Sequence, residues 1–174
     1  MEIDAATRRN LELTVTLSGE NKGSLLSVMD RTLSSSGARL LASHLAAPLR
    51  DPAKIDERLD MVQFFVDSER ILMDFRSALK RCPDIERALS RLSMGRGGPR
   101  DIGAIRDGLK LGMNLRATLE VSFLSNVPQG IVGAIKGLGD DREIIKQFSE
   151  ALGAELPLYA RDGGFIAQGF SPEL

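Results

Sequence analysis

The sequence has no tryptophan, one tyrosine and seven phenylalanines, so few large aromatic side chains are available for a core. Its single cysteine, Cys82, has no second cysteine with which to form an internal disulfide. No apolar run approaches the ~18 residues of a membrane span, and no stretch has the form of a signal peptide. We therefore predict a cytoplasmic protein, with no membrane contact, whose core of leucine, isoleucine and alanine favours helices.

The chain also lacks a charge excess and the residues of a catalytic or metal site. Its 23 lysines and arginines nearly balance 24 aspartates and glutamates, which disfavours an autonomous nucleic-acid-binding domain. The only histidine, His44, lies among Leu41, Leu45 and Pro48, without partners for base or metal chemistry. The sequence thus predicts no catalytic residue, no metal ligand and no cofactor-binding residue.

Apolar residues recur at intervals of three and four along most of the chain after residue 24, which is the pattern of amphipathic helices. Short connections between them favour antiparallel neighbours, and 174 residues fit one domain. The fold class is therefore predicted to be mainly α, a multi-helix array of antiparallel amphipathic helices. The expected stripes are Ile55, Leu59, Val62 and Phe65; Ile71, Phe75 and Leu79; Ile85, Leu89 and Leu92; Ile102, Ile105, Leu109 and Met113; Ile131, Ile135 and Leu138; and Ile144 or Ile145, Phe148 and Leu152.

Several helix starts carry capping residues. Asp51-Pro52 places a carboxylate at an N-cap and a proline at the first helical position, where its missing N–H costs nothing. Asp140, with Glu143 three residues later, resembles a capping box. The other predicted starts are at Asp67 or Ser68, at Pro83-Asp84 and at Gly98-Pro99.

Two stretches depart from the helical pattern. Leu11 to Leu17 alternates apolar and polar residues, which predicts a short, half-buried N-terminal strand. Leu158 to Phe170 has two short apolar pieces around Asp162-Gly163-Gly164, which predicts a small C-terminal hairpin or an irregular turn. The two stretches are candidates for pairing as a small edge sheet.

Three loops bear residues with a chemical alternative. SGENKGS, residues 18–24, does not match a phosphate-binding loop because Lys22 precedes Gly23, so we interpret it as a turn before a helix that starts near Ser24. Asp162 has no second carboxylate or nucleophile beside it and is interpreted as a turn residue. GRGGPR, residues 95–100, is interpreted as an interhelical turn, with contact of Arg96 and Arg100 to a DNA backbone as the alternative.

The stretch TRRNLELT, residues 7–14, concentrates polar side chains between short apolar residues. Arg8, Arg9, Asn10 and Glu12 would either grip a phosphate or form a polar seam that seats one part of a larger protein on another. The planar donor fork of arginine suits carboxylates and carbonyls as well as phosphates.

Together, TRRNLEL, DRT, GARLL and PRD occur in an order that resembles the core and lever region of the MutS family of DNA mismatch repair proteins, from about Ala5 to Leu174. The resemblance implies a longer parent protein with mismatch-reading and connector domains before this region and a clamp and ATPase domain after it. Mismatched duplex DNA, ATP with magnesium, and homodimer formation are then expected of the parent. It also favours the polar seam over the phosphate grip for Arg8, Arg9, Asn10 and Glu12.

The resemblance divides the chain into three parts: residues 1–23, an extended segment entering the core; 24–157, the helical core and lever; and 158–174, a turn or hairpin leading towards the clamp. The leading hypothesis is a core/lever segment, not itself an enzyme, that couples DNA binding to the ATPase.

A free-standing helical interaction module is the alternative. A weak DNA-binding domain, based on Arg96, Arg100 and Arg106, ranks third because the net charge is near zero. Uncovered apolar faces also predict self-association.

Overall fold

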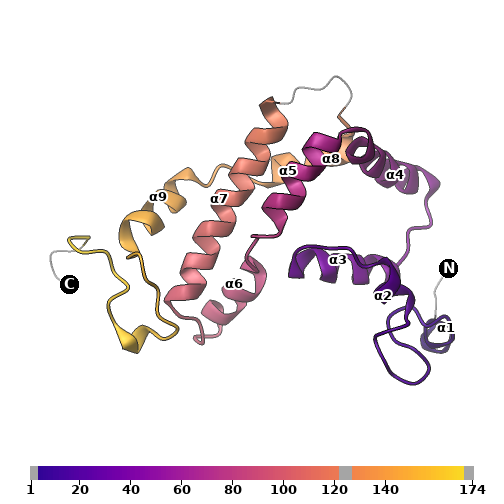
Figure 1. Cartoon of the computed structure of the whole chain (residues 1–174), viewed down its shortest axis with the longest axis horizontal. Helices are drawn as coiled ribbons and strands as arrows, with labels where there is room; N and C mark the ends of the chain where they lie inside the picture. The colour runs from indigo at the N-terminus through magenta and orange to yellow at the C-terminus, as the bar shows by residue number, and fades with distance from the viewer. Residues whose placement is uncertain (1–3, 122–126, 171–174) are drawn as a thin grey trace.

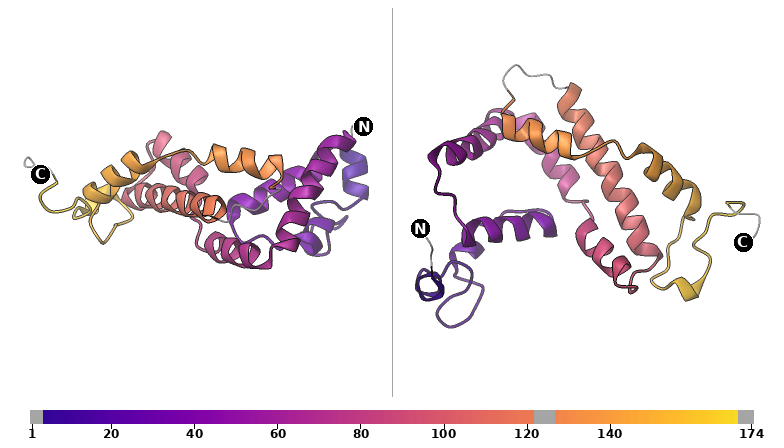
Figure 2. Two further views of the ribbon diagram at one scale, coloured as in Figure 1. Left: turned by 90° about the horizontal axis from the view of Figure 1, so that it is seen from above. Right: turned by 180° about the vertical axis from the view of Figure 1, so that it is seen from behind.

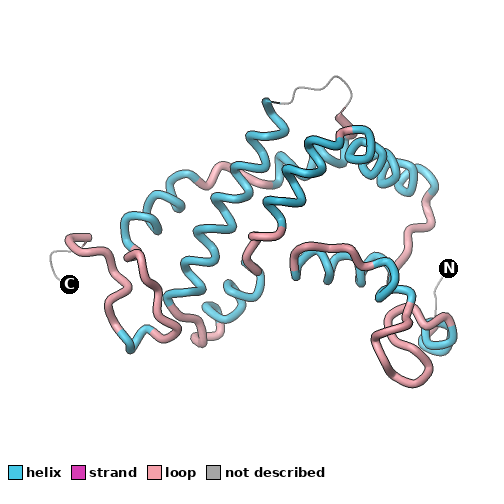
Figure 3. Tube along the Cα trace, viewed as in Figure 1, coloured by secondary structure: helices cyan, strands magenta, loops and turns pink. Residues whose placement is uncertain are grey.

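A computed structural model describes residues 4–121 and 127–170. Within these ranges the chain forms nine α-helices, one short 3-10 helix and no strand, which confirms the predicted mainly α class (Figure 1, Figure 3). The elements are α1 (Ala5–Asn10), α2 (Leu25–Met29), α3 (Ser35–Ala46), α4 (Pro52–Asp67), α5 (Glu69–Leu79), α6 (Ile85–Ser93), α7 (Pro99–Val121), α8 (Gln129–Gly137), α9 (Arg142–Ala151) and η1 (Ala160–Asp162).

The longest helix, α7, is the centre of the fold. Helices α5, α6 and α9 all pack against it, while α4 packs against α5 and α8. In Figure 1, α5 and α9 flank α7 and run in the opposite direction, as expected for an antiparallel array. Helices α1 to α3 form a separate group, which we call the N-terminal arm, at the end of the molecule opposite η1 (Figure 1, Figure 2).

Four predicted helix starts are confirmed, at Pro52, Glu69, Ile85 and Pro99. Asp51 caps α4 by accepting a hydrogen bond from the amide of Ala53 at 3.1 Å. Asp84 caps α6 by accepting from the amide of Arg87 at 3.2 Å. These carboxylates satisfy amides that have no partner inside the helix, which explains why the sequence marks the boundaries clearly.

The capping box predicted at Asp140 is wrong. Helix α9 has Asp141 at its N-cap, and that residue makes no side-chain capping bond. The Asp140 carboxylate instead accepts two hydrogen bonds from the Arg142 guanidinium, at 2.8 and 2.9 Å, and these bonds lower the pKa of Asp140. A charged donor two residues away competes successfully with neutral backbone amides because charge-assisted hydrogen bonds are stronger.

The strand predicted over Leu11–Leu17 is also wrong. Asp4 caps a short helix, α1, by accepting from the amide of Thr7 at 2.6 Å, and the residues after α1 form a loop. Glu12 takes a left-handed backbone conformation, with φ of +47°, which turns the chain sharply. An alternating pattern therefore occurs here without a strand, and α1 lies within the segment expected to be extended.

Backbone hydrogen bonds show how this loop is held without a partner strand. The carbonyls of Glu12 and Leu13 accept from the amides of Leu25 and Leu26, both at 2.9 Å. Leu13 is buried by this contact with the start of α2, whereas Leu11, Val15 and Leu17 are exposed. Only one member of the alternating apolar set reaches the interior.

The C-terminal segment turns at η1 and folds back on the end of α9. Gly163 and Gly164 both have positive φ, at +67° and +69°, and Leu152 pairs with Ile166 in an isolated antiparallel bridge. The predicted turn is therefore present, but the predicted pairing with residues 11–17 is wrong, because that loop lies at the other end of the molecule (Figure 1). Residues 171–174 of the predicted C-terminal segment lie outside the described residues.

The hydrophobic core is small. It centres on three buried side chains from α5, α7 and α8. Partly buried apolar residues of α4, α5, α8 and the residue Val127 surround them. The buried residues are Ile71, Leu119 and Ile131, and those packed against them are Met61, Phe64, Phe65, Phe75, Val127 and Ile135.

Helix α4 exposes much of the stripe that its sequence predicted to be internal. Phe65 packs on the core, but Leu59 and Val62 are 58% and 56% exposed. Ile55 and Val66 continue the same face and are 37% and 63% exposed. We call Ile55, Leu59, Val62 and Val66 the α4 stripe; it faces solvent in this chain.

The total surface agrees with this incomplete burial. The chain exposes 12379 Å². The size scaling of monomeric proteins gives roughly 8,300 Å² for a mass of 18.9 kDa. The excess of about half means that the helices cover one another far less than those of a self-contained domain.

Glycines allow the closest helix contacts. A Cβ atom placed on Gly108 of α7 would lie 2.5 Å from Cγ1 of Ile85 in α6 and 3.3 Å from Cγ of Pro83. In contrast, a Cβ atom on Gly133 of α8 would meet nothing within 4 Å. The α6–α7 contact therefore depends on the missing side chain at Gly108.

We predict that Gly108→Ala lowers the free energy of unfolding by about 1–3 kcal/mol, because the added methyl overpacks the α6–α7 contact. The matched variant Gly133→Ala should raise it by about 0.5–1 kcal/mol through helix propensity alone. Urea unfolding monitored by circular dichroism measures both. Equal stability of the two variants would contradict the packing described here.

Candidate interaction surfaces

An ion-pair cluster ties the N-terminal arm to the rest of the molecule. The Arg39 guanidinium of α3 donates to both carboxylate oxygens of Asp84, each at 2.8 Å, and to Glu86 at 2.7 Å. These three hydrogen bonds join α3 to the start of α6. We call this contact the Arg39 fork; its two-point geometry fixes orientation as well as distance.

Asp84 accepts hydrogen bonds from two sources. It receives the Arg39 fork and also caps α6 through the amide of Arg87. The hydrogen bonds from Arg39, followed by the smaller effect of the Arg87 amide, lower the pKa of Asp84 to about 2. Because only 19% of the Asp84 side chain is exposed, water screens the pair less than an ordinary surface pair.

The sequence marks Asp84 as a helix cap but carries no local signal for its partner Arg39. The two residues are 45 positions apart, and nothing in the local pattern of either indicates the contact. A helix cap is marked by nearby residues, whereas a long-range ion pair depends on how the helices pack. Only covariation between the two positions in related sequences would have revealed it.

We predict that Asp84→Asn destabilises the chain at neutral pH, since asparagine keeps the N-cap but not the charge. The folded-state pKa is lowered, so the charge stabilises the fold above the ordinary aspartate pKa and this contribution is lost as the pH falls through about 2. The stability gap should therefore be constant from pH 7 to 5 and close between pH 4 and 2. Urea titrations across this range measure it.

Asp74→Asn, which changes an exposed aspartate of α5, is the matched control for this experiment. It should give no comparable gap at neutral pH. A gap of the same size in both variants would show that net charge, and not the Arg39 fork, is responsible.

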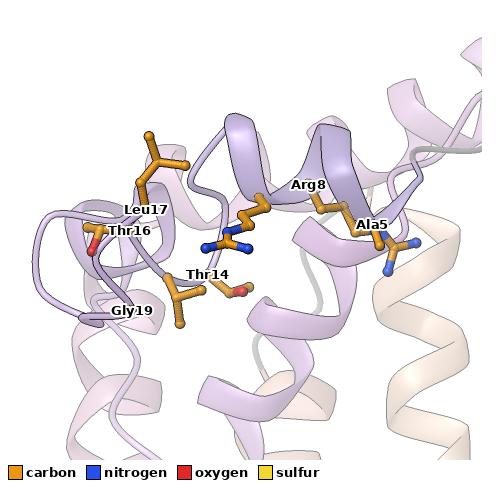
Figure 4. Close-up of a pocket in the computed structure, with 8 residues that line it drawn as sticks. Ala5, Arg8, Thr14, Thr16, Leu17 and Gly19 are labelled. Carbon is orange, nitrogen blue, oxygen red and sulfur yellow. The ribbon is translucent and has the colours of Figure 1, made fainter.

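The residues of the polar motif at the N-terminus occupy different positions: Glu12 bonds within the loop, whereas Arg8 and Arg9 line a hollow. The Glu12 carboxylate accepts a hydrogen bond from the amide of Leu17 at 2.6 Å, which closes the loop after α1. Arg8 and Arg9 on α1 line a hollow of about 620 Å³ facing this loop (Figure 4). Asn10 is the last residue of α1. The seating role predicted for these residues stays a prediction.

The loop beyond Glu12 is internally bonded. The Thr16 amide donates to the Glu20 carbonyl at 2.8 Å, and the Glu20 amide donates to the Thr16 hydroxyl at 3.1 Å. Ser24, nearly fully buried, caps α2 by accepting from Ser27 and donates to the Asn21 carbonyl at 2.7 Å. The predicted turn before a helix near Ser24 is thus confirmed, and the loop has a defined shape.

The predicted DNA-backbone residues lie around the turn between α6 and α7. Arg96 is exposed in the turn. Of the turn predicted over residues 95–100, residues 95–98 connect the two helices, whereas Pro99 and Arg100 already belong to α7. Arg100 donates from Nε to the Leu156 carbonyl at 2.8 Å and so holds the loop after α9 against α7. Arg106 donates to Asp107 at 2.8 Å. Contact of Arg96 and Arg100 with DNA stays a prediction.

A second hollow, of about 370 Å³, is an apolar groove beside the α4 stripe. Helices α4, α5, α7 and α8 contribute its walls, and Arg58 is the one charged residue among those that line it. Val62 belongs to both the groove and the stripe, so the two form one continuous apolar surface. The lining residues are Arg58, Met61, Val62, Phe65, Phe75, Leu119, Ile131, Ala134, Ile135 and Leu138.

Metal and membrane features were sought in residues 4–121 and 127–170. No three His, Cys, Asp or Glu side chains lie close enough there to hold a metal ion. No helix of these ranges has both the length and the apolar character needed to cross a bilayer. His44, on α3, is half-buried.

Comparison with known proteins gives consistent matches. A family model described as MutS domain III matches residues 6–168. The DNA mismatch repair protein MutS of Nitrobacter hamburgensis is 50% identical over 175 residues, which cover 100% of this chain and 19% of that protein. The same-named proteins of Rhizobium meliloti and Ruegeria pomeroyi are each 49% identical, over 99% and 100% of this chain and 19% and 20% of theirs. The chain spans about a fifth of the length of these relatives.

Proposed function

This chain belongs to the MutS family of DNA mismatch repair proteins, and we propose that it serves as the core and lever segment that couples DNA binding to ATP hydrolysis. Mismatched duplex DNA, ATP and magnesium would then be bound by other parts of a longer, cytoplasmic and homodimeric protein. The segment itself would supply no catalytic residue. Its contribution would be mechanical.

The arrangement around α7 supports a mechanical role. At 1.5 Å per residue, its 23 residues extend about 34 Å. Along this length α7 packs against α5, α6 and α9, so a displacement at one end has packed helices through which to act at the other. Coupling between distant sites requires a connected element of this kind with discrete packing arrangements.

The uncovered apolar surface is the observation that carries the proposal. The α4 stripe exposes isoleucine, leucine and valine side chains that a self-contained domain would bury, and the adjoining groove is lined by apolar residues apart from Arg58. Further helices of the parent protein packed on this surface would account for it. A free-standing interaction module would also use such a surface, but identity near 50% across the whole chain to much longer repair proteins favours the lever.

Coupling is tested in the full-length parent with Gly108→Ala, which perturbs the α6–α7 contact, and Gly133→Ala as control. We expect Gly108→Ala to reduce the change in ATP turnover caused by mismatched duplex several-fold while basal turnover is kept. Steady-state ATPase assays with matched and mismatched duplexes measure this. Unchanged coupling in a folded Gly108→Ala protein would contradict the proposal, as would ATP turnover by the isolated 174-residue chain.

Self-association of the isolated chain is a separate prediction. The exposed α4 stripes of two molecules are expected to pack against each other when no other polypeptide covers them. Sedimentation velocity should show a weight-average mass that rises with concentration. The triple variant Leu59→Gln, Val62→Gln and Val66→Gln should remove that rise. Val28→Gln, at a 64% exposed position of α2, is the control and should keep it. A concentration-independent monomer for the unmodified chain would refute the prediction.

A further inference from the structure

We propose that the α4 stripe is one side of a two-helix coiled-coil contact, and that its occupant is an amphipathic helix of the parent protein with a carboxylate placed against Arg58. This inference rests on the proposed function and specifies the spacing and the charge of the polypeptide that covers the stripe. The spacing of the stripe and the position of Arg58 beside it carry the inference.

The stripe has the spacing of a coiled-coil seam. Ile55, Leu59, Val62 and Val66 follow one another along α4 at intervals of four, three and four residues. This alternation is that of the d and a positions of a heptad, at which each side chain inserts between four residues of a second helix. The seam is about 16 Å long at 1.5 Å per residue, so about three turns of a partner helix cover it.

Helix α4 has an open side on which such a partner can lie. Figure 1 shows α4 at the outer edge of the helical array, where α5 and α8 pack against it. The seam residues are 37–63% exposed, and the groove of about 370 Å³ adjoins them at Val62. A second helix presents side chains at the same spacing, whereas the side chains of a strand repeat every two residues and match only part of the seam. The occupant is therefore a helix.

Arg58 lies on the edge of the seam. In the heptad set by the stripe it occupies the g position, one residue before Leu59, and it is half-buried where the groove begins. Charged residues at e and g positions form the ion pairs that determine partner choice in coiled coils. A carboxylate on the partner is the complementary group, since guanidinium groups bind carboxylates through paired hydrogen bonds.

The acidic residues of α4 nearest to Arg58 in sequence do not neutralise it. Asp56 and Asp60 are two positions away and Glu57 is one position away, and side chains at these spacings do not face each other on a helix. Asp56 is at an e position, on the other edge of the seam. The residue one turn before Arg58 on its own side is Lys54, a second cation.

The other elements that line the groove do not supply an acid to Arg58 either. Helix α8 carries Lys136 as its one charged residue. In residues 4–121 and 127–170, no hydrogen bond or ion pair of the Arg58 guanidinium is found, and Glu120 and Asp140 bond to Arg116 and Arg142. The acidic residues within three positions of a lining residue on these elements are Asp74, Glu120, Asp140 and Asp141.

A second copy of α4 is less suited to the seam. In an antiparallel pair the g positions face each other, so Arg58 would meet another Arg58. In a parallel pair it would meet the e position of the next heptad, which is Gln63. Neither arrangement offers a carboxylate, so self-association of the isolated chain is expected to be weaker than binding of an acidic helix.

The occupant is identified in the full-length parent by photo-cross-linking. Benzoylphenylalanine is placed at Leu59 in the seam or, as the control, at Asp60, which is exposed on the polar side of α4. We expect Leu59 to cross-link within the same polypeptide, several-fold more than Asp60, to a segment outside these 174 residues. By mass spectrometry that segment should have apolar residues at heptad spacing and an acidic residue at an e or g position.

The charge requirement is tested on the isolated chain with two fluorescein-labelled helical peptides. One has three repeats of Leu-Ala-Ala-Leu-Glu-Gln-Glu, and its counterpart has three repeats of Leu-Ala-Ala-Leu-Lys-Gln-Lys. Fluorescence anisotropy should show about three- to tenfold tighter binding of the acidic peptide. Arg58→Gln should remove this preference, while Arg96→Gln, the same change of charge in the exposed turn after α6, should keep it.

Packing on the seam is separated from charge by a second pair of variants. Leu59→Gln should weaken both peptides several-fold, whereas Val28→Gln, on the arm, should weaken neither. Circular dichroism confirms that each variant is folded. The unmodified chain with the two peptides gives an answer that needs no variant.

Several results would overturn the inference. They are a cross-link from Leu59 to a second copy, to DNA or to this chain alone, no cross-link from Leu59, and equal affinity for the two peptides. Loss of the preference in Arg96→Gln as well as in Arg58→Gln would show that net charge is responsible. The ATPase coupling test changes Gly108, which is outside this surface, so its outcome is independent of the cross-link and of the peptide affinities.

Discussion

The Arg39 fork is the interaction on which the shape of the chain depends. Helices α4 to α9 hold together through apolar packing around α7, but the N-terminal arm lies apart from that packing. The arm is joined to the later helices by residues 47–51 and by three charged hydrogen bonds from one guanidinium. Charged hydrogen bonds are directional, so they fix the orientation of the arm relative to α6. Apolar packing is not directional, and a helix as short as α2, with five residues, offers little surface for it.

The apolar part of the fold has the opposite character. Among the described residues only a few side chains are fully buried, and the missing side chain of Gly108 lets α6 and α7 approach closely. The remaining apolar residues form the α4 stripe and the groove beside it. The buried apolar side chains hold the helices in place around α7. The exposed apolar side chains are suited to contact with other polypeptide.

Local chemistry explains which features could be predicted from sequence. Helix starts at Pro52, Ile85 and Pro99 were predicted because cap and proline effects act within three residues. The strand at Leu11–Leu17 failed because alternation specifies a strand only where a neighbouring strand exists, and here the carbonyls of Glu12 and Leu13 bond to α2 instead. The motif of Arg8 and Arg9 was recognised, but its hollow depends on the loop conformation. The Arg39 fork depends on tertiary packing and left no local signal.

Asp84 belongs to two structures at once, as the cap of α6 and as the acceptor of the Arg39 fork. A change in the stability of the first turn of α6 therefore affects the position of the arm, and a change in the position of the arm affects that turn. Fraying of that turn would weaken the grip on Arg39, and withdrawal of the arm would leave the helix with a less ordered cap. Hydrogen exchange at the amide of Arg87 therefore reports on the position of the arm, because the cap of this helix also accepts the hydrogen bonds of Arg39.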